Sequence, residues 1–380
     1  LIIDDRDFIT IPCDDILRTC GQDASILTRY LRQFHEACIS HNLELNGFII
    51  HTVPKEVFEL TSLTELHMSG NSIKVLGAEV EALECLRFAD LSYNRIKSIP
   101  ATIGKLRNLE ELDVQCNALL HLPPIICAMD NLKLIHVVGN KSLSVPREVQ
   151  NAGTPTLKLF LKGMHTGANE SVVDWSELNK LKVAKLRSVP DVLFTMNWIA
   201  DLNLDGNSVH RLPQEFGSLK ALTRLSARFN LIEKLPAEIK KFRCLDKLYL
   251  DHNRLQSIPT SLYTHLPLNV LGLTHNNLDS GCIPEDLQMG AASKLQALTL
   301  DHNNLGKLSS SLQVFLSLKM LTFNYNTVGS LPHELGACTA LTDLQFDAND
   351  VEELPAPMQN LTNLVRLKLN DNKISNLPDW

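Results

Sequence analysis

Three histidines, His252, His275 and His302, recur at matching places in successive stretches of similar sequence, and Asp251 and Asp301 directly precede the first and the last. Imidazole nitrogens and carboxylate oxygens bind zinc and serve as general bases. On neighbouring strands of one sheet, such side chains would be about 4.8 Å apart, which is close enough to share an ion. The alternative, which we favour, is a solvated ridge or a partner contact, because each histidine stands at the expected solvent-facing end of a strand. We therefore expect no metal, while histidine titration near neutral pH also suits a pH-responsive contact.

A second candidate for chemistry is the stretch from Asp201 to Gly206, which matches the first half of a calcium-binding loop, D-x-N-x-D-G. The twelfth residue of such a loop should be a bidentate glutamate, but here it is Leu212. The chain also has no P-loop, zincin or nucleophile-elbow motif. We expect no catalytic residue and no cofactor.

The histidines belong to an internal repeat with the pattern L-x-L-x-x-N-x-L-x-x-L-P. Successive copies within each run begin about 23 residues apart, and a single longer step separates Leu271 from Leu298. The first template position falls at Leu43, Leu66, Ala89, Leu112 and Ile135, and then at Leu202, Leu225, Leu248, Leu271, Leu298, Leu321, Leu344 and Leu367. Weaker copies begin at Leu1 and near Asn179, which makes 15 copies in all.

The template predicts one coil of a solenoid. Its first two apolar positions alternate and so share one face of a short strand. The asparagine can satisfy buried backbone groups in the bend that follows. Later apolar residues at spacings of three suit a 3₁₀ or short helical return. One coil cannot bury its own leucines, but stacked coils share a core, which predicts a curved α/β solenoid with a parallel β-sheet on the concave face and short 3₁₀ or α segments on the convex face.

This pattern resembles the leucine-rich repeat family, and the resemblance covers nearly the whole chain. Twelve copies keep the asparagine: Asn71, Asn94, Asn117, Asn140, Asn207, Asn230, Asn253, Asn276, Asn303, Asn326, Asn349 and Asn372. The period of about 23 residues and the leucine-proline pair are similar to the intracellular, Ras-group class, which includes scaffolds of the Scribble and Ras-suppressor type. The resemblance implies a horseshoe fold and protein binding, with a small GTPase or its regulator as the partner class.

Two stretches interrupt the repeats, and their apolar residues have helical spacing. Each contains an aromatic residue, a leucine and a basic residue in a row, Tyr30-Leu31-Arg32 and Phe160-Leu161-Lys162. This element is similar to one in leucine-rich repeat-containing protein 40 and its relatives. Each helix is expected either to cover an open end of the core or to act as a docking helix or hinge. The predicted organisation is the end of an upstream repeat run at 1–12, a helical interruption at 13–42, repeats at 43–146, a helical interruption or linker at 147–178, and repeats at 179–380.

The solvent-facing positions of the predicted strands change from basic and aromatic, through the histidines, to acidic. Arginine and aromatic residues are enriched at interface hot spots, and a charge gradient can orient a charged partner, although charge also varies along any solvated face. The predicted partner-binding residues on the concave face are Arg224, Arg228, Phe229, Lys247, Tyr249, Asp251, His252, His275, Asp301, His302, Asn324, Tyr325 and Asp347.

Composition narrows the class of protein further. The 380 residues carry a net charge of −7 and have a pI near 6.0, which argues against a nucleic-acid-binding surface. No apolar run is long enough for a membrane span. The nine cysteines are scattered, which is typical of a reduced intracellular protein, so we expect a cytoplasmic location.

The sequence therefore predicts a non-catalytic protein-binding scaffold with a role in signalling. The alternative is the sensor or regulatory region of a larger enzyme, a kinase, a Roco-type GTPase or a cyclase, whose catalytic domain lies outside this chain. The first and last residues both fall inside a repeat, so further sequence is expected on each side.

Overall fold

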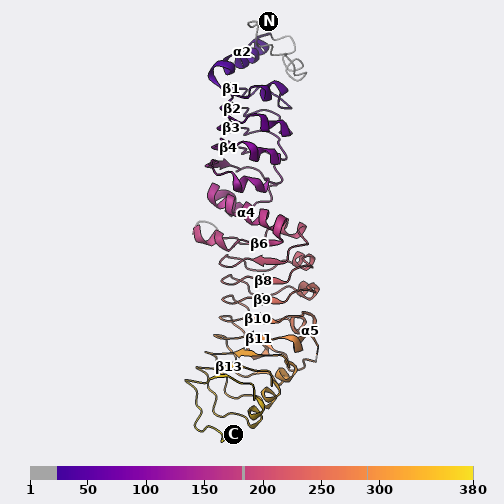
Figure 1. The fold of residues 1–380 in the computed structure, drawn as a ribbon, viewed down its shortest axis with the longest axis vertical. Coiled ribbons are helices and arrows are strands. Elements are labelled where there is room, and N and C mark those ends of the chain that lie inside the picture. Colours follow the sequence, from indigo (N-terminus) through magenta and orange to yellow (C-terminus); the bar gives the residue numbers. More distant parts are fainter. Residues whose placement is uncertain (1–23, 182–184, 289, 380) are drawn as a thin grey trace. The chain divides into compact units, whose positions relative to one another are not determined.

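The computed structural model describes residues 24–181, 185–288 and 290–379, and the chain divides into two compact units, Leu1–His165 and Thr166–Trp380 (Figure 1). Each unit is a stack of coils, and each coil contributes one short strand to a parallel sheet. Within each unit the strands lie on one side of the coils and the short 3₁₀ helices lie on the other.

The first unit contains a five-stranded sheet. Its strands are β1 (Asn42–Glu44), β2 (Glu65–His67), β3 (Phe88–Asp90), β4 (Glu111–Asp113) and β5 (Leu134–His136). The predicted template positions form the central row of the sheet, since Leu43 pairs with Leu66, and Ala89, Leu112 and Ile135 follow in register. All five side chains are buried, so they form one continuous apolar column.

The second unit contains a nine-stranded sheet. Its strands are β6 (Val172–Asp174), β7 (Asp201–Asn203), β8 (Arg224–Ser226), β9 (Lys247–Tyr249), β10 (Val270–Gly272), β11 (Ala297–Thr299), β12 (Met320–Thr322), β13 (Asp343–Gln345) and β14 (Arg366–Lys368). Leu248, Leu271 and Leu298 are register partners on adjacent strands, despite the longer step between the last two. The predicted stacking of coils is therefore confirmed.

The second sheet begins earlier than the sequence pattern indicates. Its first strand pairs Val173 with Leu202, whereas the copy placed near Asn179 falls in the 3₁₀ helix η5 (Ser176–Leu181). Val173 and Trp175 are buried at the two inward positions, so a tryptophan stands where the template has its second leucine. The pattern missed this coil because the tryptophan and the longer step to Leu202 hide it. The copy placed at 1–12 and residues 13–23 lie outside the described residues.

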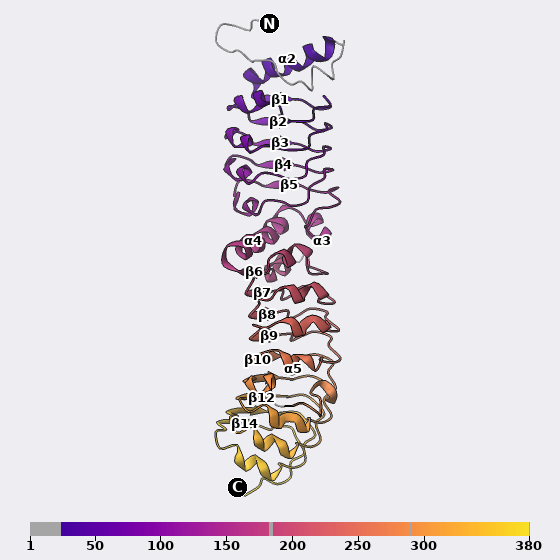
Figure 2. The ribbon, with the colours of Figure 1, turned by 90° about the vertical axis from the view of Figure 1, so that its right-hand side faces the viewer.

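A helix of 17 residues precedes each sheet: α2 (Ala24–Ser40) before β1, and α4 (Thr154–Glu170) before β6. A single residue with positive φ, His41 or Ser171, joins each helix to its strand. In the first unit α2 lies next to β1 (Figure 2), and Tyr30 of α2 packs with its ring centroid 5.8 Å from that of Phe48, so the helix covers the start of the core. The short helix α3 (Arg147–Asn151) follows β5.

The return segments are mostly 3₁₀ helices, as the spacing of three predicts. Most begin directly after a proline, whose carbonyl accepts the first hydrogen bond, as from Val57 N to Pro54 O at 3.1 Å. They are η1 (Lys55–Glu59), η2 (Ala78–Ala82), η3 (Ala101–Lys105), η4 (Pro124–Ala128), η5 (Ser176–Leu181), η6 (Asp191–Thr195), η7 (Gln214–Ser218), η8 (Ala237–Lys241), η9 (Ser280–Cys282), η10 (Ala291–Lys294), η11 (Ser310–Val314), η12 (His333–Ala337) and η13 (Ala356–Asn360).

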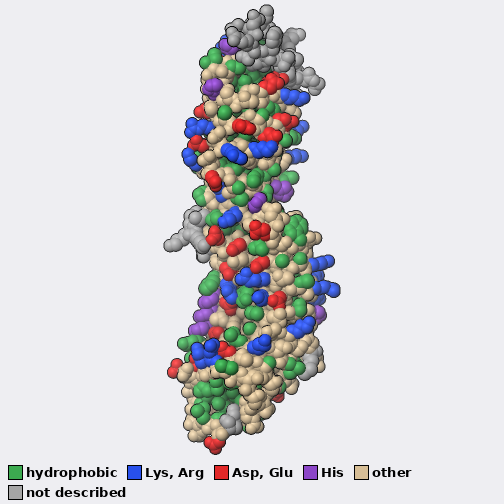
Figure 3. All heavy atoms as spheres, in the orientation of Figure 1, with side chains coloured by type: hydrophobic (Ala, Val, Ile, Leu, Met, Phe, Trp, Pro, Cys, Tyr) green, Lys and Arg blue, Asp and Glu red, His purple; other side chains and the backbone are tan. Residues whose placement is uncertain are grey.

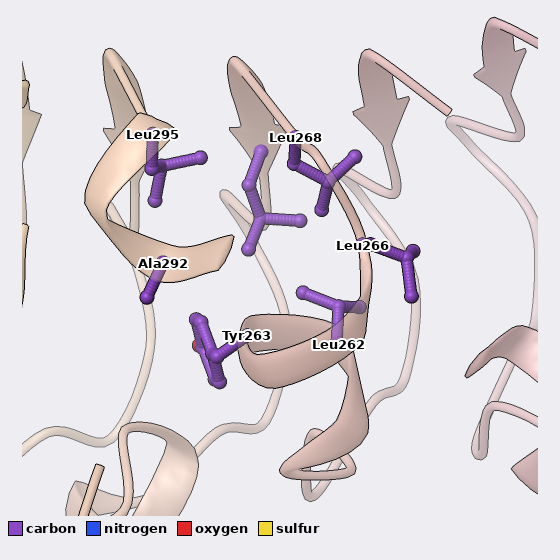
Figure 4. Close-up of a pocket in the computed structure, with 7 residues that line it drawn as sticks. Leu262, Tyr263, Leu266, Leu268, Ala292 and Leu295 are labelled. Atoms are coloured by element: carbon purple, nitrogen blue, oxygen red, sulfur yellow. The ribbon is translucent and has the colours of Figure 1, made fainter. Parts of the chain in front are cut away.

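The longer step between Leu271 and Leu298 is absorbed on the helical side, next to α5 (Ser261–His265). Tyr263 of α5 is buried, and its hydroxyl donates a hydrogen bond to Cys282 O at 3.0 Å. Leucines of α5 and β10 meet Ala292 and Leu295 around a small apolar cavity (Figure 4). This cavity belongs to the core, because the side chains that line it are apolar apart from the bonded tyrosine hydroxyl.

The template asparagines hold the coils together. Asn253 accepts a hydrogen bond from Ile232 N at 3.0 Å and donates to Ala227 O at 2.8 Å, both in the preceding coil, and to Leu250 O at 3.0 Å in its own. All twelve asparagines accept a backbone N–H of the preceding coil in this way. One parallel strand per coil, an asparagine ladder and a shared leucine core define an α/β leucine-rich repeat solenoid.

We expect replacement of Asn253 by alanine to lower the free energy of unfolding by about 1–3 kcal/mol, because buried backbone groups of two coils lose their partners. Asn277 provides a matched control, since it is exposed and its side chain makes no hydrogen bond within the described residues. Urea denaturation followed by circular dichroism measures both variants. An Asn253→Ala midpoint equal to that of Asn277→Ala would contradict a stabilising ladder.

Candidate functional site

Five aromatic rings form a continuous stack along one edge of the strands in the second unit. We call it the ring ladder; it consists of Phe229, His252, His275, His302 and Tyr325, each directly before a template asparagine. Successive ring centroids are 4.2, 4.2, 3.9 and 4.2 Å apart, and the ring planes differ by no more than 17°. Figure 3 shows histidine side chains gathered along this edge of the second unit.

The backbone explains why the rings align. All five residues have φ between 52° and 55°, in the left-handed region that favours glycine. The same backbone conformation in each coil points every side chain in the same direction. Because the strands are in register, the rings meet face to face rather than alternating.

The ring ladder is a surface feature. Phe229 is 56% exposed and Tyr325 is 57% exposed, whereas apolar side chains of the core are nearly inaccessible. The imidazole planes are parallel, so their nitrogens do not converge on one point, as the ligands of a tetrahedral zinc ion must. Within the part of the chain that the structure describes, no group of three or more His, Cys, Asp or Glu side chains is arranged to hold a metal ion.

The two aspartates beside the ring ladder have structural partners. Asp251 accepts hydrogen bonds from Thr274 N and from Arg228 Nε, both at 2.9 Å. Asp301 accepts from Asn324 N at 2.7 Å and from the Thr322 hydroxyl at 2.6 Å. A second ladder therefore runs beside the asparagines, in which an acidic or amide side chain binds the backbone N–H of the next coil.

The same column contains two more of the predicted partner-binding residues. Asn324 accepts a hydrogen bond from Asp347 N at 2.7 Å, and Asp347 accepts one from Asn370 N at 2.7 Å. Sequence reasoning missed Asp205, which accepts hydrogen bonds from Arg228 N and from the Ser226 hydroxyl, both at 2.7 Å. The signal for Asp205 was its place in register, three residues after a template leucine, as for Asp251 and Asp301.

The two arginines of the basic end are paired. Arg224 Nη1 lies 3.1 Å from Asp201 Oδ2, and this hydrogen bond raises the pKa of the guanidinium. Arg228 pairs with Asp251 and places its guanidinium carbon 4.1 Å from the centre of the Tyr249 ring. Lys247 is exposed on the adjacent position. The basic end of the surface is thus largely neutralised by neighbouring carboxylates.

These contacts also account for the calcium-like stretch. Its carboxylates, Asp201 and Asp205, bind Arg224, Ser226 and the Arg228 backbone. Leu202, Leu204 and Leu212 are buried. The stretch is therefore an ordinary strand and bend of the solenoid.

Solved structures of other proteins resemble this fold, whereas no protein-family model and no curated protein matches the chain. A leucine-rich repeat protein of Leptospira interrogans is 24% identical, with 88% of this chain and 79% of that chain covered and a TM-score of 0.45. The internalin InlF of Listeria monocytogenes is 20% identical over 98% of this chain and 100% of that chain, with a TM-score of 0.47.

The leucine-rich repeat ectodomain of the plant membrane receptor kinase GASSHO1/SCHENGEN3 from Arabidopsis thaliana, solved in complex with CASPARIAN STRIP INTEGRITY FACTOR 2, is more distant. It is 22% identical, with 84% of this chain and 40% of that chain covered and a TM-score of 0.38. We assign the fold from the strand register and asparagine ladder of this chain itself. Among the described helices, none is long and apolar enough to cross a membrane.

The second ladder can be tested at Asp301. We expect Asp301→Ala to lower the free energy of unfolding by about 1 kcal/mol, because Asn324 N and the Thr322 hydroxyl lose their acceptor. Asp301→Asn should lower the free energy of unfolding much less, because an asparagine can also accept this backbone hydrogen bond. Asn324 does so from Asp347 N in the next coil. Urea denaturation compares the two variants, and equal losses would contradict the hydrogen-bonding role.

The histidines predict a pH dependence of stability. Burial, followed by the neighbouring His275, lowers the pKa of both His252 and His302 from the ordinary value of 6.5. The unfolded chain then binds protons more readily than the folded chain, so this stability is fully present above pH 6.5 and is lost as pH falls through the lowered values.

The double variant His252→Phe, His302→Phe keeps both rings and removes both titrations, and Phe229 shows that phenylalanine fits this backbone. When the pH is lowered from roughly 7.5 to 5, the thermal unfolding temperature should fall further for the natural protein than for the variant. The carboxylates are the same in both proteins, so an equal loss would rule out the histidines as the cause.

Proposed function

We propose that the chain is a non-catalytic protein-binding scaffold and that the ring ladder, with the strand positions beside it, contacts another folded protein. The observation that carries this proposal is the exposed five-ring stack on a backbone held by two hydrogen-bonded ladders. Aromatic side chains are enriched at interface hot spots, and a rigid surface loses little entropy on binding.

The predicted partner-binding residues divide into two groups under this proposal. The ring ladder, Lys247 and the Arg228-Tyr249 pair would touch the partner. The second group would not touch the partner but would hold adjacent coils together through hydrogen bonds to the backbone; it consists of Asp251, Asp301, Asn324 and Asp347. Arg224 would contribute through its pair with Asp201.

The finer assignments belong to the same proposal. The resemblance to Ras-group repeats and to leucine-rich repeat-containing protein 40 favours a signalling role in the cytoplasm, with a small GTPase or its regulator as partner. Within the described ranges the cysteines are free thiols, which suits a reducing compartment.

The test compares two positions of the same template. We expect the double variant Phe229→Ala, His275→Ala to bind its partner at least about tenfold more weakly, as loss of an interface anchor does. Alanine fits this backbone, because Ala348 stands at the same position with φ of 53°. Affinity purification of the full chain with mass spectrometry identifies candidates, and calorimetry with each purified candidate measures affinity.

Tyr93 supplies the matched control in the first unit. It stands at the same template position, has φ of 53° and is 59% exposed, close to the value for Tyr325. Tyr93→Ala should leave capture unchanged. Equal affinity of the double variant and the natural protein for every captured partner would move the binding surface away from the ring ladder.

A further inference from the structure

The ring ladder ends at a position that has no ring. Beyond Tyr325 the same template position is held by Ala348 and then by Asp371, with φ of 53° at both. Strands β12, β13 and β14 are in register, and Tyr325 N and Ala348 N each donate to the next coil at 2.9 Å. The side chains of Tyr325, Ala348 and Asp371 therefore point in the same direction, one strand spacing apart.

Among the described residues, this arrangement leaves one face of the Tyr325 ring without a stacking partner. His302 covers the other face at 4.2 Å, and the ring is 57% exposed. A methyl group is the whole side chain of Ala348, so it cannot cover a phenol ring. Tyr325 and Asp371 then stand roughly two strand spacings, about 9 Å, apart, which leaves room for one planar group between them.

The far side of this space carries an unused carboxylate. Asp371 is exposed and has no hydrogen bond or ion pair within the described residues. Two other aspartates of the last coils are engaged, Asp343 with Arg366 at 2.7 Å and Asp350 with Lys373 at 2.7 Å. Lys368, on β14, makes no ion pair with Asp371 in the part of the chain described.

Elsewhere on this surface, one guanidinium contacts a tyrosine ring and an aspartate of the adjacent coil at once. The guanidinium of Arg228 lies 4.1 Å from the centre of the Tyr249 ring and pairs with Asp251 at 2.9 Å. At the end of the ring ladder a tyrosine and a carboxylate stand two coils apart, and among the described residues no guanidinium lies between them.

We propose that the space over Ala348, between Tyr325 and Asp371, receives an arginine side chain of the protein partner. This inference rests on the proposed function, because it names the chemistry by which the same surface recognises its partner. A guanidinium is planar and permanently charged, so it can stack on the phenol ring while the carboxylate on its other side attracts its charge. A lysine ammonium can pair with Asp371 but cannot stack as a plane. The exposed Glu352 and Glu353 in the same coil as Ala348 add negative charge that favours a cationic partner.

The five tyrosines of the chain make a direct test possible. The full chain labelled with 3-fluorotyrosine gives fluorine signals that Tyr→Phe variants assign. Titration with acetyl-arginine amide should shift the Tyr325 signal until it saturates. Acetyl-lysine amide should bind more weakly by roughly two- to fivefold, because an ammonium cannot stack as a plane on the ring, and acetyl-citrulline amide should give no saturable shift.

Three variants locate the effect. Ala348→Phe fills the space with a ring and should abolish the arginine shift, and Asp371→Asn should weaken binding by roughly two- to fivefold through loss of the charged acceptor. Glu215→Gln is the control, because it removes the same charge from an exposed position in the 3₁₀ helix η7, away from the ring ladder. The other tyrosine signals show whether each variant is folded.

The inference is overturned if arginine leaves the Tyr325 signal unmoved, if citrulline shifts it as strongly, or if Ala348→Phe binds arginine like the natural protein. Its failure is distinct from failure of the proposed function, which is tested at Phe229 and His275 with the purified partner. If that double variant loses affinity for the partner while the arginine titration is negative, only the arginine site is disproved and the proposed function stands.

Discussion

The side-chain amide of the template asparagine is the interaction on which the rest of the structure depends. A coil of this length cannot pair the backbone groups of its own bend, and each asparagine accepts and donates the missing hydrogen bonds within and between coils. These bonds keep each coil one strand spacing from the next and in register. The leucines then share a continuous interior, which no single coil could bury. Where Phe48 replaces the asparagine in the first coil, the position is still buried, but α2 covers it with an aromatic side chain.

The template asparagine is also accompanied by a fixed backbone conformation of the residue that precedes it. The residue before it has positive φ in all twelve coils that carry the asparagine. Gly70, Gly139 and Gly206 show that the solenoid requires no side chain there, and glycine is the least strained choice. The fold therefore does not require the strain that side chains with rings add at five successive positions. The same positive φ occurs at Tyr93, Cys116 and Ala348, so the strain alone does not mark a site. What is special to the ring ladder is that the regular backbone holds five successive rings parallel and in contact.

The sequence was sufficient to place the strands wherever leucine and asparagine recur, because both side chains act through burial and backbone bonding that every coil repeats. It failed at Val173, where Trp175 and a longer coil change the spacing, so the sheet begins before the predicted repeat run. The histidine column was visible from its spacing, but face-to-face stacking depends on the backbone φ, which the sequence does not show. The structural task of Asp251 and Asp301 was also hidden, because Arg228 and Thr274 interrupt their column.

Most arginines on this surface form ion pairs with aspartates of the same molecule. The charged groups that remain unpaired are therefore the ones available to a partner. Arg224, Arg228 and Arg366 each bind an aspartate on an adjacent coil, so a long-range gradient is weak. Exposed ion pairs of this kind contribute little stability on their own, but they leave few charges free to meet a partner. Under the proposed function, specificity would then come from short-range contacts at positions where the internal pattern is incomplete. Arg228 contacts a tyrosine ring and an aspartate at once, whereas no guanidinium of the described residues lies between Tyr325 and Asp371. Under the proposed arginine site, the partner would supply this cation.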